Sequence, residues 1–109
     1  MALSRTFIQT WRKWIRLDIS TRKLPLNSAK AKSYEVELDH LRSYVHSLGN
    51  GVIESRNYNF KELASAELER LNKISLEIES NDVKGTENEE LQHYISTTRL
   101  LLEEIKTSS

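Results

Sequence analysis

The sequence predicts an all-α protein in which an N-terminal basic amphipathic helix is followed by a small three-helix bundle or helical hairpin. Apolar residues recur at the spacing of a helix in four segments of the chain. The chain contains only three glycines and one proline, so few positions can interrupt these segments. No segment alternates between apolar and polar residues for long enough to predict a strand.

Charge divides the 109-residue chain into two parts, although its formal net charge is zero. Residues 1–32 contain eight basic residues and one acidic residue, whereas residues 33–109 contain eight basic and fifteen acidic residues. We therefore expect two regions: a basic amphipathic targeting segment with its linker over 1–32, and a small helical domain over 33–109.

Residues 3–17 of the first region are predicted to form a helix with two chemically distinct faces. The apolar face contains Leu3, Phe7, Trp11 and Trp14, with Ile8 and Ile15 beside them, and the basic face contains Arg5, Arg12, Lys13 and Arg16. Serine and threonine fill the flanks, and no acidic residue precedes Asp18. This composition is typical of a mitochondrial import signal. Phe7, Trp11, Trp14 and the basic side chains are therefore expected to contact an import receptor or a membrane surface transiently.

Two other interpretations of this helix remain open. It can be a retained helix that docks on a membrane or a partner, or it can be the ordinary first helix of the bundle. A secretory signal is excluded because the segment lacks a continuous apolar stretch, and no part of the chain has the roughly twenty apolar residues of a transmembrane helix. The residues around Pro25 predict a linker, and any cleavage is expected between about Ser20 and Ser33.

The second region contains three helical segments, over about 29–48, 60–79 and 87–106. In the first, Tyr34, Leu38, Leu41, Val45 and Leu48 follow a heptad-like spacing. Gly49 stands where a left-handed C-terminal cap is expected, and Gly51 would permit a sharp reversal. Asn59 is expected to cap the second segment. Because the glycines interrupt the seams, a compact bundle is favoured over an extended coiled coil.

Four leucines lie at the margins of the apolar stripes of the second and third segments. They are Leu63, Leu76, Leu100 and Leu101. If they are exposed, they offer apolar surface to another protein. The sequence therefore predicts a protein partner and leaves the oligomeric state open.

Residue patterns typical of catalysis are missing from the chain. It has no cysteine, its three histidines lack a metal-binding spacing, and it has no glycine-rich phosphate loop. We therefore expect no enzyme activity, no catalytic residues, no cofactor and no metal. Nucleic acid is an expected partner only if the basic N-terminal arm is retained, because an acidic domain repels phosphates.

These observations together predict a small, non-catalytic helical protein that is imported into mitochondria and acts through protein–protein contacts. The expected location is the matrix or the matrix face of the inner membrane. An assembly factor or accessory subunit of a respiratory-chain or ATP-synthase complex fits this description. The first alternative is a mitochondrial ribosome- or RNA-associated protein with a retained basic arm, and the second is a coiled-coil subunit of a cytosolic complex.

Overall fold

A computed structural model describes residues 4–23, 31–80 and 86–108 of the chain. Its helices are α1 (Arg5–Arg22), α2 (Ala31–Ile53), α3 (Phe60–Ser80) and α4 (Thr86–Ser108). The predicted linker residues 24–30 lie outside the described ranges.

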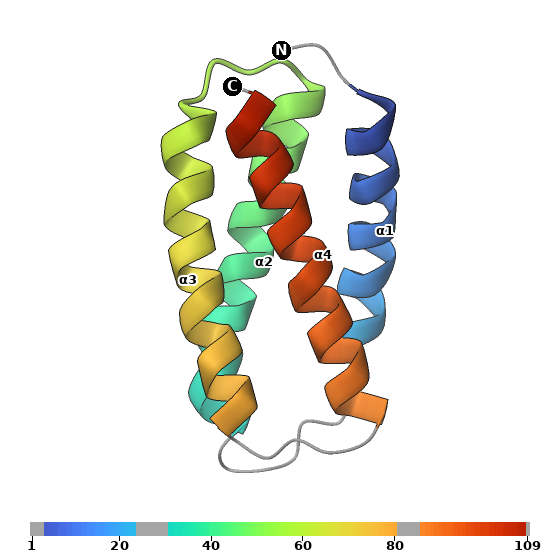
Figure 1. Ribbon diagram of the computed structural model, residues 1–109, viewed down its shortest axis with the longest axis vertical. Helices are drawn as coiled ribbons and strands as arrows, with labels where there is room; N and C mark the ends of the chain where they lie inside the picture. Colours follow the sequence, from blue (N-terminus) through green and yellow to red (C-terminus); the bar gives the residue numbers. More distant parts are fainter. Residues whose placement is uncertain (1–3, 24–30, 81–85, 109) are drawn as a thin grey trace.

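Successive helices run in opposite directions, so that α1 begins at the end of the bundle where α4 finishes (Figure 1). Helix α4 packs against both α1 and α3, and α3 packs in turn against α2. The all-α class and the helical bundle are thus confirmed. The bundle has four helices because α1 packs against α4 and adds its apolar face to the core of the second region.

Heptad-like spacing explains how the helices bury their apolar residues. On α2 the residues Tyr34, Leu38, Leu41, Val45, Leu48 and Val52 are at most 4% exposed, and they alternate in steps of four and three. Such rows favour the near-antiparallel packing of a bundle. The other helices contribute Phe7, Trp14, Phe60, Ala64, Leu71, Ile74, Ile78, Leu91, Tyr94, Ile95, Leu101, Leu102 and Ile105 to the same core.

The N-terminal ends of two helices are fixed by capping side chains. Ser4 Oγ accepts a hydrogen bond from the Phe7 N–H at 3.0 Å, at the start of α1. Asn59 Oδ1 accepts one from the Glu62 N–H at 3.4 Å, at the start of α3. The second contact confirms the predicted cap, which satisfies a backbone N–H that the helix itself leaves unpaired.

The predicted end of α2 at Leu48 is wrong, because the helix continues through both glycines to Ile53. The left-handed residue is instead Ser55, with φ of 55°. Its N–H donates to the Val52 carbonyl at 3.2 Å, and the Arg56 N–H donates to the Gly51 carbonyl at 2.9 Å. This pair of bonds is the Schellman pattern that closes helix C-termini.

Candidate functional site

Helix α1 presents the two faces that the sequence predicts, and its apolar face forms part of the core. Phe7 is 5% exposed and Trp14 is fully buried, while Trp11 is half-buried against the core. The basic residues Arg5, Arg12, Lys13 and Arg16 are all exposed. Of the apolar residues proposed for receptor or membrane contact, Phe7 and Trp14 are therefore covered by the folded chain, and Trp11 is covered in part.

Trp11 lies directly on the backbone of α2. A Cβ atom added to Gly49 would come within 1.9 Å of Cζ3 of Trp11, so only glycine leaves room for the ring. The ring also stacks on Trp14 with centroids 5.4 Å apart and lies 5.6 Å from the His46 ring. Gly49 thus serves close packing between α1 and α2, which is the physical reason that it does not end the helix.

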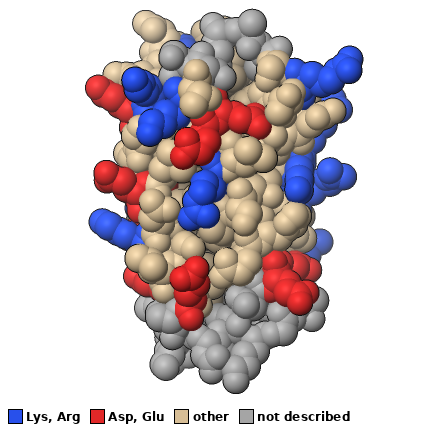
Figure 2. Space-filling view, viewed as in Figure 1, with Lys and Arg blue, Asp and Glu red and all other residues tan. Residues whose placement is uncertain are grey.

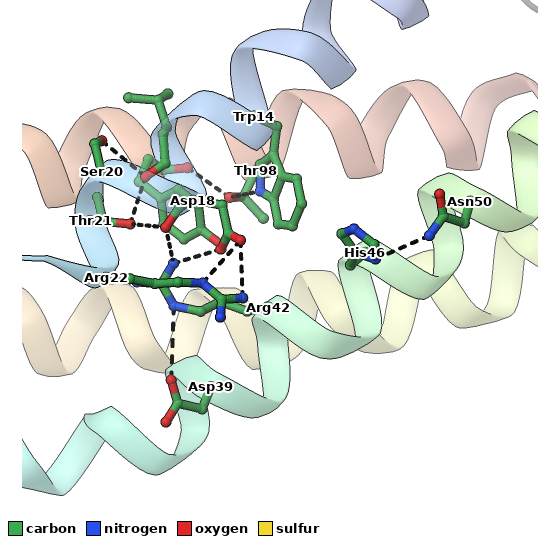
Figure 3. A network of polar contacts seen from close by, with 12 residues as sticks. Trp14, Asp18, Ser20, Thr21, Arg22, Asp39, Arg42, His46, Asn50 and Thr98 are labelled. Atoms are coloured by element: carbon green, nitrogen blue, oxygen red, sulfur yellow. Dashed lines mark hydrogen bonds and ion pairs between the residues drawn. The ribbon is translucent and has the colours of Figure 1, made fainter.

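Trp14 joins α1 to α4. Its indole Nε1 donates a hydrogen bond to Thr98 Oγ1 at 2.9 Å, and both groups are buried (Figure 3). Its ring stacks on Tyr94 with centroids 5.9 Å apart. The one polar atom of the indole therefore keeps a partner inside the core, which avoids the cost of burying an unpaired donor.

Asp18 is the centre of a buried polar network between three helices. Its Oδ1 accepts hydrogen bonds from Nη1 of Arg42 at 2.6 Å and from the hydroxyl of Tyr94 at 2.8 Å. Arg42 also donates to the Asp18 carbonyl at 2.9 Å, and Arg22 Nη2 lies 3.1 Å from Oδ2 (Figure 3). Burial raises the pKa of Tyr94 far above its ordinary value, so this hydroxyl remains a donor.

The geometry of this network indicates a structural role. Asp18 and Arg42 are 5% and 4% exposed, and each charge is neutralised by the other inside the bundle. The Arg42 guanidinium also lies 4.8 Å from the centroid of the Tyr94 ring. The network therefore stabilises the packing of α1 against α2 and α4.

Sequence reasoning missed both members of this ion pair, although the pattern contained a signal for each. Asp18 lies four residues after Trp14, on the apolar line of α1, and Arg42 lies four residues after Leu38 on the seam of α2. Opposite charges on two apolar faces are expected to meet when those faces pack, because a buried charge requires a partner.

The outer face of α1 is basic and partly apolar. The only acid of α1, Asp18, is buried, so the exposed charged residues of the helix and of its C-cap residue are all basic: Arg5, Arg12, Lys13, Arg16, Arg22 and Lys23. Figure 2 shows Lys and Arg side chains along the right edge of the molecule, on the side where α1 lies in Figure 1. Ile19 is 52% exposed. An open hollow of about 550 Å³ is lined by Trp11, Arg12, Ile15 and Arg16 among the described residues.

The four predicted surface leucines have different environments. Leu63, Leu76 and Leu100 are 44%, 67% and 54% exposed, whereas Leu101 is fully buried. The placement of Leu101 on a partner surface is therefore wrong, because α4 lies between α1 and α3 and buries a broader stripe than one neighbour would require. Leu63 and Leu76 are thirteen residues apart on α3, or about 20 Å along the helix. They do not form one patch.

Tyr44 and Leu63 flank a smaller hollow that sequence reasoning did not find. Its volume is about 150 Å³, and its lining consists of Tyr44, Ser47, Leu48, Tyr58, Leu63 and Glu67. These residues come from α2, α3 and the segment between them. Helical periodicity does not predict this hollow, because the hollow depends on how the Tyr58 ring packs.

Metal ligands do not cluster in the described part of the chain: no three His, Asp or Glu side chains are arranged to hold an ion. None of the helices described over 4–23, 31–80 and 86–108 is long and apolar enough to cross a membrane.

Comparison with protein-family models, with curated proteins and with solved structures gave no match.

Proposed function

We propose that this chain is a non-catalytic helical protein of mitochondria that acts by binding other proteins. An assembly factor or accessory subunit of a respiratory-chain or ATP-synthase complex is the class that fits best. The observation that supports this proposal is the division of α1 into a core-forming apolar face and an outer face whose exposed charges are all basic.

The two faces of α1 suit two successive steps, which are import of the unfolded chain and binding of a partner by the folded chain. Before folding, the apolar face is free for an import receptor, and the basic face responds to an inside-negative membrane potential. After folding, Phe7 and Trp14 are buried in the core. The basic face is then the part of α1 that a partner with acidic groups can contact.

Retention of α1 is part of the proposal. Burying a tryptophan such as Trp14 removes about 150–250 Å² from water, which corresponds to roughly 4–6 kcal/mol. Phe7 adds about 1.5–3 kcal/mol. Since a domain of this kind is stable by only about 5–15 kcal/mol, removal of α1 would take away much of that stability. We therefore propose an import signal that is not cleaved.

An RNA- or ribosome-associated role would use the same basic face, and retention of α1 is the condition for it. Such a role gains affinity from aromatic rings that stack on bases. Trp14 is fully buried, and Trp11 is half-buried with part of its ring against Gly49, so Trp14 is closed to bases and Trp11 is closed in part. Protein is therefore the better-supported partner, and the salt dependence of binding distinguishes the two because contacts with phosphates weaken steeply as salt is added.

Import of the full chain with a fluorescent reporter at its C-terminus tests the proposal. Replacing Arg12 and Arg16 with glutamate is expected to abolish mitochondrial localisation. The matched control replaces Lys61 and Lys73, which are exposed on α3, with glutamate and is expected to leave localisation unchanged. If the wild-type reporter stays in the cytosol, the proposed mitochondrial location is wrong.

The intact mass of the native protein tests retention. We expect a mass that includes residues 5–22, because α1 belongs to the core. A stable native protein that lacks this helix would contradict the argument from Phe7 and Trp14.

A further inference from the structure

Helix α1 has a second apolar row outside the core, formed by Ile8, Trp11, Ile15 and Ile19. The first three are partly buried and Ile19 is 52% exposed, so all four present carbon surface to the solvent. Steps of three, four and four residues place them along one side of the helix. This outer apolar row is distinct from the residues that α1 buries in the core.

Cations lie directly beside the outer apolar row. Arg12 follows Trp11 and Arg16 follows Ile15, so each arginine is about 100° around the helix from an apolar neighbour. Arg12 and Arg16 are themselves about one turn apart. These four side chains line the open hollow of about 550 Å³ on the outer face of α1. The hollow therefore combines apolar carbon with two guanidinium groups.

The arginines at this hollow differ from the others of the bundle in their partners. A side chain of Asp, Glu or Asn is bonded to Arg22, Arg42, Arg56, Arg70 and Arg99. No side chain within the ranges 4–23, 31–80 and 86–108 forms such a bond with Arg5, Arg12 or Arg16. Guanidinium groups bind phosphate oxygens through paired hydrogen bonds. Those of α1 are therefore available to an anion from outside the chain.

The combination of unpaired cations and exposed carbon favours an anionic phospholipid as the ligand. A lipid headgroup supplies a phosphate for the guanidinium groups, and the region below it accepts apolar side chains. RNA also supplies phosphates, but it gains most from aromatic rings that stack on bases, and aliphatic side chains such as Ile15 and Ile19 offer none. The outer apolar row is thus explained by a lipid and not by a polymer of phosphates.

The shape and charge of the molecule suit a flat membrane surface. Helix α1 has 18 residues, is about 27 Å long, and lies along one edge of the bundle (Figure 1). Its exposed cations extend from Arg5 to Arg22, so the whole length of the helix can contact one surface. Residues 33–109 contain fifteen acids and eight bases. An anionic surface therefore attracts α1 and repels the rest of the chain.

We propose that the folded protein binds the surface of a membrane that contains anionic phospholipids, with α1 lying in the plane of the headgroups. Arg12 and Arg16 donate hydrogen bonds to lipid phosphates, while Trp11, Ile15 and Ile19 contact the carbon chains below them. The core face of α1 stays packed in the bundle. This inference goes beyond the proposed function, which concerns protein partners, and rests on it only for the retention of α1.

Sedimentation of the full-length protein with lipid vesicles tests the proposal. The protein should bind vesicles of phosphatidylcholine and phosphatidylglycerol in roughly equal amounts and should not bind vesicles of phosphatidylcholine alone. Arg12→Gln combined with Arg16→Gln should weaken binding about 25-fold, because each basic residue near an anionic surface contributes a factor of about five. The matched control, Lys61→Gln with Lys73→Gln on α3, should change the affinity by less than about twofold. Equal losses in the two variants, or no binding to the anionic vesicles, would overturn the proposal.

Substitution of Ile19 separates contact with lipid from attraction between charges alone. Ile19→Ser should weaken binding to the anionic vesicles about three- to tenfold, because about half of an isoleucine side chain no longer enters the lipid. The matched control is Leu76→Ser, which removes an apolar side chain that is 67% exposed on α3 and should leave the affinity unchanged. If Ile19→Ser binds as tightly as the wild type, the proposal is wrong and a ligand with phosphates alone, such as RNA, is indicated.

Tryptophan fluorescence shows whether the bundle stays folded on the membrane. Anionic vesicles with brominated acyl chains should quench the wild-type protein, because Trp11 lines the hollow. In Trp11→Phe only the buried Trp14 remains, so most of the quenching should be lost. Full quenching of Trp11→Phe would mean that α1 leaves the core, and docking of the folded protein would be refuted. These assays use purified protein and vesicles, so their outcome is independent of the import test.

Discussion

Replacement of Gly49 with alanine is the sharpest test of how α1 is seated. The new Cβ would lie 1.9 Å from Cζ3 of Trp11, where carbon atoms in contact are normally about 3.5–4.0 Å apart. The ring would thus have to move by about 1.5–2 Å. Trp14 and His46 pack against the same ring, which restricts where it can go.

Two opposing effects determine how much Gly49→Ala changes the free energy of unfolding. Alanine in place of glycine inside a helix is favourable by about 1 kcal/mol. Overpacking against a restrained ring costs about 1–3 kcal/mol or more. We therefore expect Gly49→Ala to lower the free energy of unfolding by about 0.5–2 kcal/mol in the wild-type protein. In a Trp11→Ala background the clash is absent, and Gly49→Ala should raise the free energy of unfolding by about 1 kcal/mol.

Urea denaturation followed by circular dichroism measures all four proteins of this double-mutant cycle. The decisive observation is the reversal of sign, which corresponds to a coupling energy of about 1.5–3 kcal/mol between the two positions. Ser47→Ala, at an exposed position of α2, is the control and should change stability by no more than about 0.5 kcal/mol. If Gly49→Ala stabilises both backgrounds equally, Trp11 does not lie on α2 and the seating of α1 is refuted.

Three further outcomes follow from the ion pair, the cap of α2 and the buried acid. Arg42→Met should lower the free energy of unfolding by about 3–5 kcal/mol, because it leaves the buried charge of Asp18 unpaired. Adding Asp18→Asn should recover at least about 1 kcal/mol of that loss in urea denaturation. If nothing is recovered, the pairing of Asp18 with Arg42 is refuted. Ser55→Gly should raise the unfolding free energy by about 0.5–1 kcal/mol, because glycine adopts positive φ without strain, and a loss of stability would contradict the left-handed cap. The pKa of Glu67 is raised, so the folded state binds its proton more tightly than the unfolded state, and this residue's contribution to stability falls as pH rises above about 4.5. Unfolding free energies measured between about pH 4 and pH 7 should therefore decline more in the wild type than in Glu67→Gln, and identical profiles would show that burial does not perturb Glu67.

Helices α3 and α4 were predicted to within about two residues at each end, because periodicity and end signals agree there. The position of α1 could not be predicted in this way. An import signal and a core helix both require one apolar and one polar face, so Phe7, Trp11 and Trp14 fit either. What separates them is the complementary surface on other helices, such as Gly49 and Thr98, and periodicity does not reveal that surface.

Local rules also conflicted with tertiary packing at the end of α2. A glycine after an apolar seam usually marks a C-terminal cap, and the prediction at Gly49 followed that rule. Rings from two other segments cover Gly49 and Gly51, and these contacts outweigh the poor helix propensity of glycine. The hollow at Tyr44 was missed for the same reason, since Tyr58 reaches it only by packing on Gly51.

The last turns of α2 therefore depend on two neighbouring rings, Trp11 from α1 and Tyr58 from the segment that follows α2. Gly49 and Gly51 each disfavour the helix by about 1 kcal/mol relative to alanine, so an isolated peptide of residues 31–53 should lose its helix near Leu48. Trp11 supplies one of the stabilising contacts, from more than thirty residues earlier in the sequence. Hydrogen exchange at residues 52–56 should thus be slow only while α1 is packed in place, which makes these amides local reporters of its release.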